Sequence, residues 1–133
     1  HKNPVRFATR VRDMTHPKKK EAFTTSEVQT LFQQLPYDRI GMSINTFAAI
    51  IRGKYSNVQK DTVLQICIGL ELCTMQTEEL LDSAGFSLSY GKMKDVVIRA
   101  CIQHRQYNPI AIERELMENG VEKKDLLFQK YKP

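Results

Sequence analysis

The sequence predicts an all-α fold, an orthogonal bundle of seven to eight short helices within 133 residues. Three observations predict it. Apolar residues recur three and four positions apart after residue 23, no segment alternates polar and apolar residues as a strand would, and the candidate connections are short. The chain divides into a basic N-terminal arm or linker, residues 1–23, and a helical domain, residues 24–133.

The first two predicted helices of the domain are amphipathic. Thr25 or Ser26 is expected to cap the first, which Pro36 ends. Ser43 is expected to cap the second, which stops at Gly53. Helical spacing predicts one buried face on each, with Val28, Leu31, Phe32 and Leu35 on the first and Phe47, Ile50 and Ile51 on the second.

The next two predicted helices follow a polar loop at residues 54–60. Residues 61–72, with Asp61 as the cap, are apolar nearly all round, which is typical of a central buried helix. Thr74 is expected to cap the following helix, which Gly85 closes.

Three further helices are predicted towards the C-terminus. The helix over residues 92–106 and the last helix, from Glu122 to about Tyr131, flank one that begins with Asn108 as cap and Pro109 in its first turn. That middle helix ends at Asn119–Gly120. The apolar stripe expected on the 92–106 helix comprises Met93, Val96, Val97, Ala100 and Cys101, and the last helix offers Leu126, Leu127 and Phe128.

The composition is that of an ordinary globular domain, 41% hydrophobic and 26% charged. A chain of this size buries roughly two thirds of its unfolded surface, so it needs no disulfide or metal to fold. Cys67, Cys73 and Cys101 form no CxxC pair and fall in apolar helical segments, so we interpret them as reduced core residues of a cytoplasmic protein. No apolar run approaches the ~18 residues of a membrane span, so no membrane partner is expected.

The net charge of +5 is unevenly distributed. Residues 1–20 hold seven basic side chains against Asp13, a charge of +6, and the other 113 residues hold 13 basic and 14 acidic ones, a charge of −1. The arm is therefore suited to a phosphate backbone or is a solvated leader. Because the chain begins at His1 rather than Met, it is compatible with a tag remnant or with the C-terminal piece of a longer protein.

No set of catalytic or metal-binding residues is recognisable. His1 and His16 lie in the arm, and His104 falls near a helix end, where the helix dipole favours a cation. The acidic residues Glu78, Glu79 and Asp82 are typical of a solvated helix face. Nucleotide-binding and hydrolase motifs do not occur. We therefore expect no enzyme activity, no catalytic residue, no cofactor and no metal.

Residues 41–54, GMSINTFAAIIRGK, carry the most specific pattern in the chain. Gly41 permits a tight turn and Met42 fills the angle between two helices. Ser43 caps the second helix, and Phe47 and Ile50 anchor it to a core. This stretch resembles the second half of a Cro-type (XRE, phage-repressor-like) helix-turn-helix.

The resemblance continues through about residue 120. Residues 61–72 are similar to the family's next helix, and residues 77–89 resemble an extension found in such domains of Firmicutes, some of them appended to larger proteins. Two more helices follow in those domains, as predicted here. The resemblance implies a bacterial protein with a helix-turn-helix core over about 26–85 and a C-terminal helical extension over about 92–131.

Two departures from the family pattern concern the DNA-facing side. The first scaffold helix usually reads Glu-x-Leu-Ala before the glycine, whereas Pro36 here must shorten or restart that helix. The positions that would face DNA are poor in donors, since Asn45 and Arg52, with Thr46 at the edge, are the polar ones. The others are Ile44, Ala48 and Ala49.

The resemblance implies a transcriptional regulator that binds double-stranded DNA, with its second helix in the major groove. The arm would add non-specific affinity, and the C-terminal helices are candidates for a homodimer contact. The alternative is a protein-interaction or regulatory module on the same scaffold, with Ile44, Ala48 and Ala49 under a protein partner; RNA binding through the arm also stays open. The candidate DNA-binding residues are Ser43, Asn45, Thr46, Ala49, Arg52, Lys54, Tyr55, Asn57 and Lys60.

Overall fold

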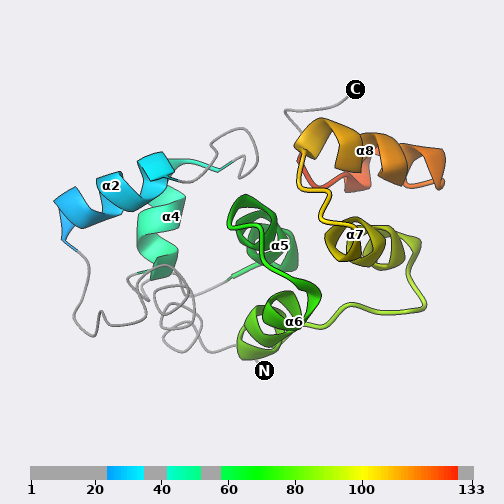
Figure 1. Ribbon diagram of the computed structural model, residues 1–133, viewed down its shortest axis with the longest axis horizontal. Helices are drawn as coiled ribbons and strands as arrows, with labels where there is room; N and C mark the ends of the chain where they lie inside the picture. The colour runs from blue at the N-terminus through cyan, green and yellow to red at the C-terminus, as the bar shows by residue number, and fades with distance from the viewer. Residues whose placement is uncertain (1–23, 35–41, 52–57, 129–133) are drawn as a thin grey trace.

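The computed structural model describes residues 24–34, 42–51 and 58–128 (Figure 1). Within these ranges it holds six α-helices and a short 3-10 helix, with no strand, which confirms the all-α prediction. The helices are α2 (Thr25–Gln34), α4 (Ile44–Ile51), α5 (Lys60–Gly69), α6 (Thr74–Ser83), α7 (Met93–Gln103) and α8 (Pro109–Glu118), followed by η1 (Lys123–Asp125). The predicted arm, residues 1–23, lies outside the described residues.

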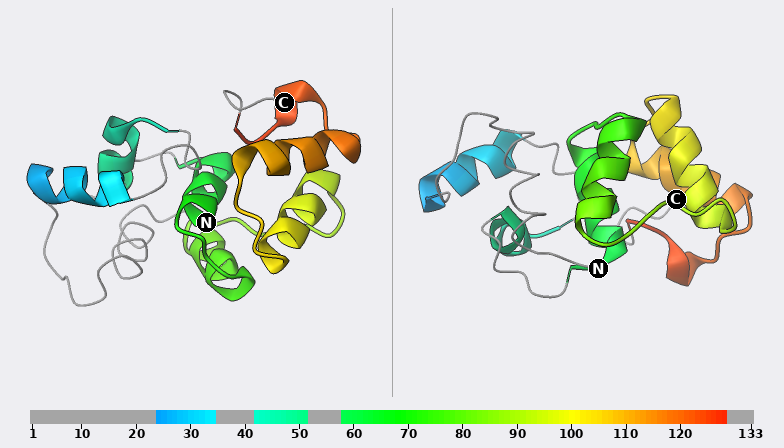
Figure 2. Two further views of the ribbon diagram at one scale, coloured as in Figure 1. Left: turned by 45° about the horizontal axis from the view of Figure 1, so that its top comes forward. Right: turned by 90° about the horizontal axis from the view of Figure 1, so that it is seen from below.

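The helices are arranged in pairs. α2 packs on α4, α5 on α6, α6 on α7 and α7 on α8. The α5/α6 pair lies between the α2/α4 pair at one end and the α7/α8 pair at the other (Figures 1 and 2).

The core follows the central helix α5, as the sequence predicts. Five of its apolar side chains are fully buried, because packed neighbours surround the helix. Phe47 of α4, Leu80 and Leu81 of α6, Ile98 of α7 and Ile112 of α8 are equally buried and continue the same core. The buried side chains of α5 are Val63, Leu64, Ile66, Cys67 and Ile68.

Several predicted helix ends are confirmed by their hydrogen bonds. The Asn108 side chain accepts the amide protons of Ile110 at 2.9 Å and Ala111 at 3.2 Å, with Pro109 in the first turn. The Ser43 hydroxyl accepts the Thr46 amide proton at 3.2 Å. Gly85 and Gly120 both take a φ of +86°, the left-handed conformation that suits a glycine just after a helix.

Three predicted caps are wrong, each by one or two positions. Thr24 rather than Thr25 or Ser26 caps α2, because Glu27 three residues later completes a reciprocal capping box with it. Gln59 rather than Asp61 occupies the cap position of α5. Asp61 lies in the first turn, where its carboxylate forms an ion pair with Lys94.

The third wrong cap is Thr74 of α6. Cys73 occupies the cap position, and the Gln76 side chain accepts the Cys73 amide proton at 3.1 Å. Cys73 is exposed at this position, so the prediction that all three cysteines are core residues is wrong for Cys73. Cys67 and Cys101 are buried as predicted. All three thiols are free.

The C-terminal segment differs from the predicted last helix. η1 stops at Asp125, and Leu126 is extended, with φ −66° and ψ 156°. The Glu113 carboxylate accepts the amide protons of Leu127 and Phe128, and the Gln65 side chain donates to the Leu127 carbonyl at 2.9 Å. These side chains replace the helical partners of that backbone, so the apolar residues predicted there are buried without forming a helix.

The apolar stripe predicted on α7 is only partly buried. Val97 and Cys101 contribute to the core together with Ile98 and Ile102, whereas Met93, Val96 and Ala100 are exposed. The helix is rotated relative to the predicted face. The cause lies in its neighbours, since α7 is tied to α5 by the Lys94–Asp61 and Lys60–Asp95 ion pairs.

Candidate functional site

The candidate recognition helix α4 is held by its buried face against α2. Phe47 has no exposed surface, and its ring lies 5.5 Å from that of Phe32, centroid to centroid, at an angle of 56°. Val28 of α2 and Met42 just before α4 are buried in the same cluster. Of the α4 positions that point away from Phe47, the structure describes the side chain of Asn45, which is exposed.

The N-terminal end of α4 carries three of the predicted DNA-binding residues. Ser43 caps the helix, and its hydroxyl lies 3.1 Å from that of Thr46. The Ser43 hydroxyl is thus engaged with the Thr46 hydroxyl and with the helix backbone. Ser43 is exposed and Thr46 is half-buried. Asn45 is exposed beside them, with a side-chain amide that can both donate and accept hydrogen bonds.

The apolar positions of the same helix lie towards α2. Ile44 and Ala48 are half-buried and pack against the core. Together with Asn45 they line a small cleft of about 140 Å³, whose other wall is formed by Thr25, Val28 and Gln29 of α2. Ile44 and Ala48 therefore face a neighbouring helix and do not form a broad exposed apolar patch.

The remaining predicted contacts divide into two groups. Ala49 belongs to α4, but its side chain lies outside the described residues, as do Arg52, Lys54, Tyr55 and Asn57. Lys60 is described, and its ammonium lies 2.6 Å from the Asp95 carboxylate with 25% of the side chain exposed. The ammonium of Lys60, a predicted DNA contact, is therefore engaged in an ion pair within the molecule.

Two buried carboxylates were not singled out from the sequence. Asp95 is 3% exposed and accepts hydrogen bonds from Lys60 and from the Ser89 amide at 2.8 Å. Glu113 has no exposed surface. Burial raises the pKa of the Glu113 carboxyl, while the Phe128 and Leu127 amides oppose that rise. Both groups hold backbone segments in place, and periodicity alone offers no signal for that role.

The buried thiols are held in their protonated form. Burial raises the pKa of Cys67 to about 12 and, together with the Glu115 carboxylate, the pKa of Cys101 to about 11. A protonated thiol is a weak nucleophile and a weak metal ligand. Among the described residues no group of histidine, cysteine and acidic side chains is arranged to hold a metal ion.

Comparison with family models, curated proteins and solved structures finds no match to this chain. Within the ranges that the structure describes, no helix has the length and apolar character needed to cross a membrane.

Proposed function

We propose that this chain is a DNA-binding regulatory domain without catalytic activity, in which α4 is the recognition helix of a repressor-type helix-turn-helix in an orthogonal bundle. The observation that carries the proposal is the exposed Asn45 at the N-terminal end of α4, on a helix whose opposite face is anchored by the buried Phe47. Recognition helices of this class contact base edges mainly through their N-terminal residues.

The chemistry of Asn45 fits base recognition. An asparagine amide can form a bidentate pair with adenine in the major groove, worth about 1–3 kcal/mol of discrimination. The seven basic residues within positions 1–20 would add affinity for phosphates that does not depend on sequence. From the resemblance to repressor-type domains and the free cysteines we propose a bacterial, cytoplasmic regulator.

A protein-interaction role for the same face of α4 has less support. It predicts an exposed apolar patch at Ile44, Ala48 and Ala49. Ile44 and Ala48 are half-buried against α2, and the Ala49 side chain lies outside the described residues. We therefore favour DNA as the ligand of α4.

The sharpest test is the substitution Asn45→Asp. A carboxylate in the first turn interacts favourably with the helix dipole, so the variant should fold, but it repels phosphates and cannot donate to adenine. Fluorescence anisotropy with mixed-sequence duplex DNA should show affinity weakened at least about tenfold, and a steep loss of wild-type affinity with rising salt.

The matched control is Gln103→Glu, which makes the same change of charge at an exposed position of α7. It should alter the affinity by no more than about twofold, since it lies on a helix at the other end of the molecule (Figure 1). Equal losses in the two variants would mean that only net charge matters. Loss of all binding on deletion of residues 1–20 would assign binding to the arm and overturn the proposal for α4.

A further inference from the structure

The solvent-facing side of α7 carries apolar side chains that no neighbouring element among the described residues covers. Met93 is 51% exposed and Val96 38% exposed, and Ala100 is exposed one turn further on. Val97 and Cys101 lie beside them, largely buried, and line the same side. These residues form a continuous stripe at helical spacing, i, i+3, i+4, i+7 and i+8.

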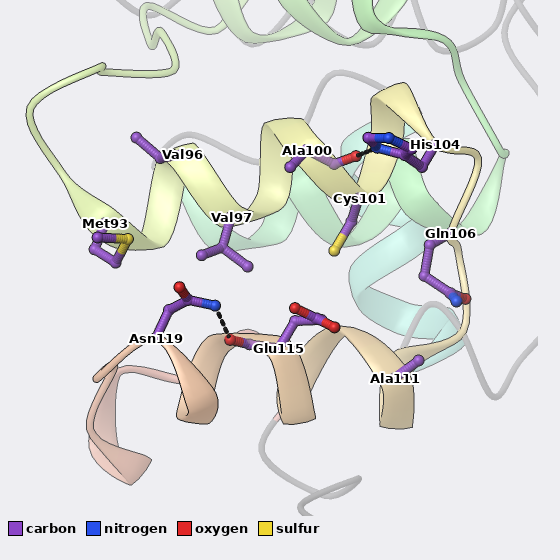
Figure 3. Close-up of a pocket in the computed structure, with 10 residues that line it drawn as sticks. All are labelled: Met93, Val96, Val97, Ala100, Cys101, His104, Gln106, Ala111, Glu115 and Asn119. Carbon is purple, nitrogen blue, oxygen red and sulfur yellow. Dashed lines mark hydrogen bonds between the residues drawn. The ribbon is translucent and has the colours of Figure 1, made fainter.

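A groove runs between this stripe and α8. Its volume is about 510 Å³, within the range of protein pockets that bind ligands. On the other side it is lined by Ala111 and Glu115 of α8 and by its C-cap Asn119, which are spaced about one turn apart. Figure 3 shows Val97 and Glu115 directed into the space between the two helices. We call this feature the α7/α8 groove.

One negative charge lies in this apolar groove. Among the described residues, the Glu115 carboxylate has no hydrogen-bond or ion-pair partner. The ammonium of Lys94, on α7, forms an ion pair with the Asp61 carboxylate at 3.0 Å. The other charged side chains on α7, Asp95 and Arg99, are likewise paired with groups outside the groove. His104 also lines the groove, with its Nδ1 2.8 Å from the Ala100 carbonyl oxygen. A complementary ligand would therefore combine apolar surface with a cation placed at Glu115.

The shape of the groove fits a helix. Its walls are the faces of two packed helices, and a third helix packs into such a groove by the ridge-and-groove geometry of helical proteins. The lining extends along α7 from Met93 to the C-cap His104, about three helical turns. An occupant of about that length would cover the exposed Met93 and Val96 side chains.

A second copy of the chain is a poorer occupant, although the C-terminal helices are candidates for a dimer contact. In a two-fold dimer the same patch meets itself, so each groove would face its own counterpart. If the two-fold axis passed close to Glu115, the two carboxylates would approach each other in an apolar interface, and like charges oppose that association.

We propose that the α7/α8 groove binds an amphipathic helix of a partner protein, which lays its apolar side chains along Met93, Val96 and Val97 and places one lysine or arginine at Glu115. This interaction is separate from the proposed DNA contact, because α4 lies at the other end of the molecule (Figure 1). It stands or falls independently of the function proposed for α4.

The test is a selection from a random library of helical peptides displayed on phage, with the full chain as bait and Val96→Asp as counter-bait. The enriched peptides should share apolar residues at helical spacing and a basic residue. Synthetic versions should bind with affinity weakened at least about tenfold by Val96→Asp. The control Ile110→Asp, an equally conspicuous exposed apolar residue of α8 outside the groove, should change it no more than about twofold.

Charge reversal at Glu115 separates the electrostatic part of the proposal from general stickiness. Repeating the selection with Glu115→Arg should enrich acidic peptides in place of basic ones, whereas Glu118→Arg, an exposed neighbour outside the groove, should leave the basic preference intact. Thermal unfolding of each variant verifies that it is folded.

Three results would overturn the proposal. They are the absence of any enriched peptide, binding that is indifferent to Val96→Asp, and a preference for peptide charge that does not reverse with Glu115→Arg. Sedimentation of the wild-type chain provides a further check. A dimer abolished by Val96→Asp but not by Ile110→Asp would assign the groove to a second copy instead.

Discussion

The carboxyl group of Glu113 illustrates how single residues hold this molecule together. It has no exposed surface, and it accepts the amide protons of Leu127 and Phe128, which lie 14 and 15 residues further along the chain. An ionised carboxylate is costly to bury, but two buried amides without acceptors would also be costly. Glu113 therefore secures the C-terminal segment while its own pKa is raised by burial.

We predict that protonation of Glu113 stabilises the fold. Because the pKa is raised in the folded state, its contribution is present below the unfolded pKa and is lost as pH rises through the folded pKa. The free energy of unfolding of wild type relative to Glu113→Gln should therefore increase as pH falls from about 7 towards about 4.5.

Urea denaturation across this range measures the effect, and the difference between the two proteins cancels groups that titrate alike in both. Glu118→Gln, on the exposed side of the same helix, is the control. A constant difference between wild type and Glu113→Gln at every pH would contradict the prediction.

At the scale of elements, the helices are delimited by local chemistry and oriented by their neighbours. Asn108 satisfies two amides at the start of α8, and the Thr24–Glu27 capping box does the same for α2. The orientation of α7 depends instead on contacts with other elements. Arg99 joins Glu78 of α6 at 2.9 Å, donates to the Leu88 carbonyl and stacks 4.5 Å from the centre of the Tyr90 ring.

We predict that the Asn108 cap contributes about 1 kcal/mol to stability. Asn108→Ala removes the acceptor for the Ile110 and Ala111 amides and should lower the free energy of unfolding by about that amount. Asn108→Ser keeps a side-chain oxygen at the cap and should unfold close to wild type. Equal losses for alanine and serine in chemical denaturation would show that the cap hydrogen bonds are not the source of the effect.

At the scale of the whole molecule, the core is distributed unevenly along the chain. α5 to α8 form a continuous series of packed helices, whereas α2 pairs closely only with α4 among the described helices. Figure 2 shows the α2/α4 pair at one end of the molecule in both views. A region with fewer contacts opens at a lower free energy than the rest of a domain.

We predict that α2 and α4 open before the rest of the described core. In native-state hydrogen exchange, the Phe47 amide, bonded to the Ser43 carbonyl at 3.1 Å, should exchange with a lower free energy of opening than the amides in the middle of α5, such as that of Leu64. The opening should also depend less on denaturant, since less surface is exposed. Equal free energies and slopes at the two helices would instead indicate a single cooperative unit.

The sequence by itself determined the described helices from α2 to α8 and where several of them end, but not the conformation of the segment after Glu122. The reason is local: Asn108 and Pro109, Ser43, and the glycines at 85 and 120 act within one turn of their own backbone. The burial of most of α5 was equally predictable, because a helix that is apolar nearly all round has to be surrounded.

Only the tertiary structure decided how the helices use their faces. Periodicity identifies an apolar stripe on α7, but it cannot tell whether a neighbour covers it, and Met93 and Val96 remain exposed. For the same reason the sequence did not predict the ion pair between Lys60 and Asp95. Nor did it predict that the Glu113 carboxylate would accept the Leu127 and Phe128 amide protons in a non-helical segment. These outcomes depend on residues brought together from distant parts of the chain, and spacing along the sequence carries no information about such pairings.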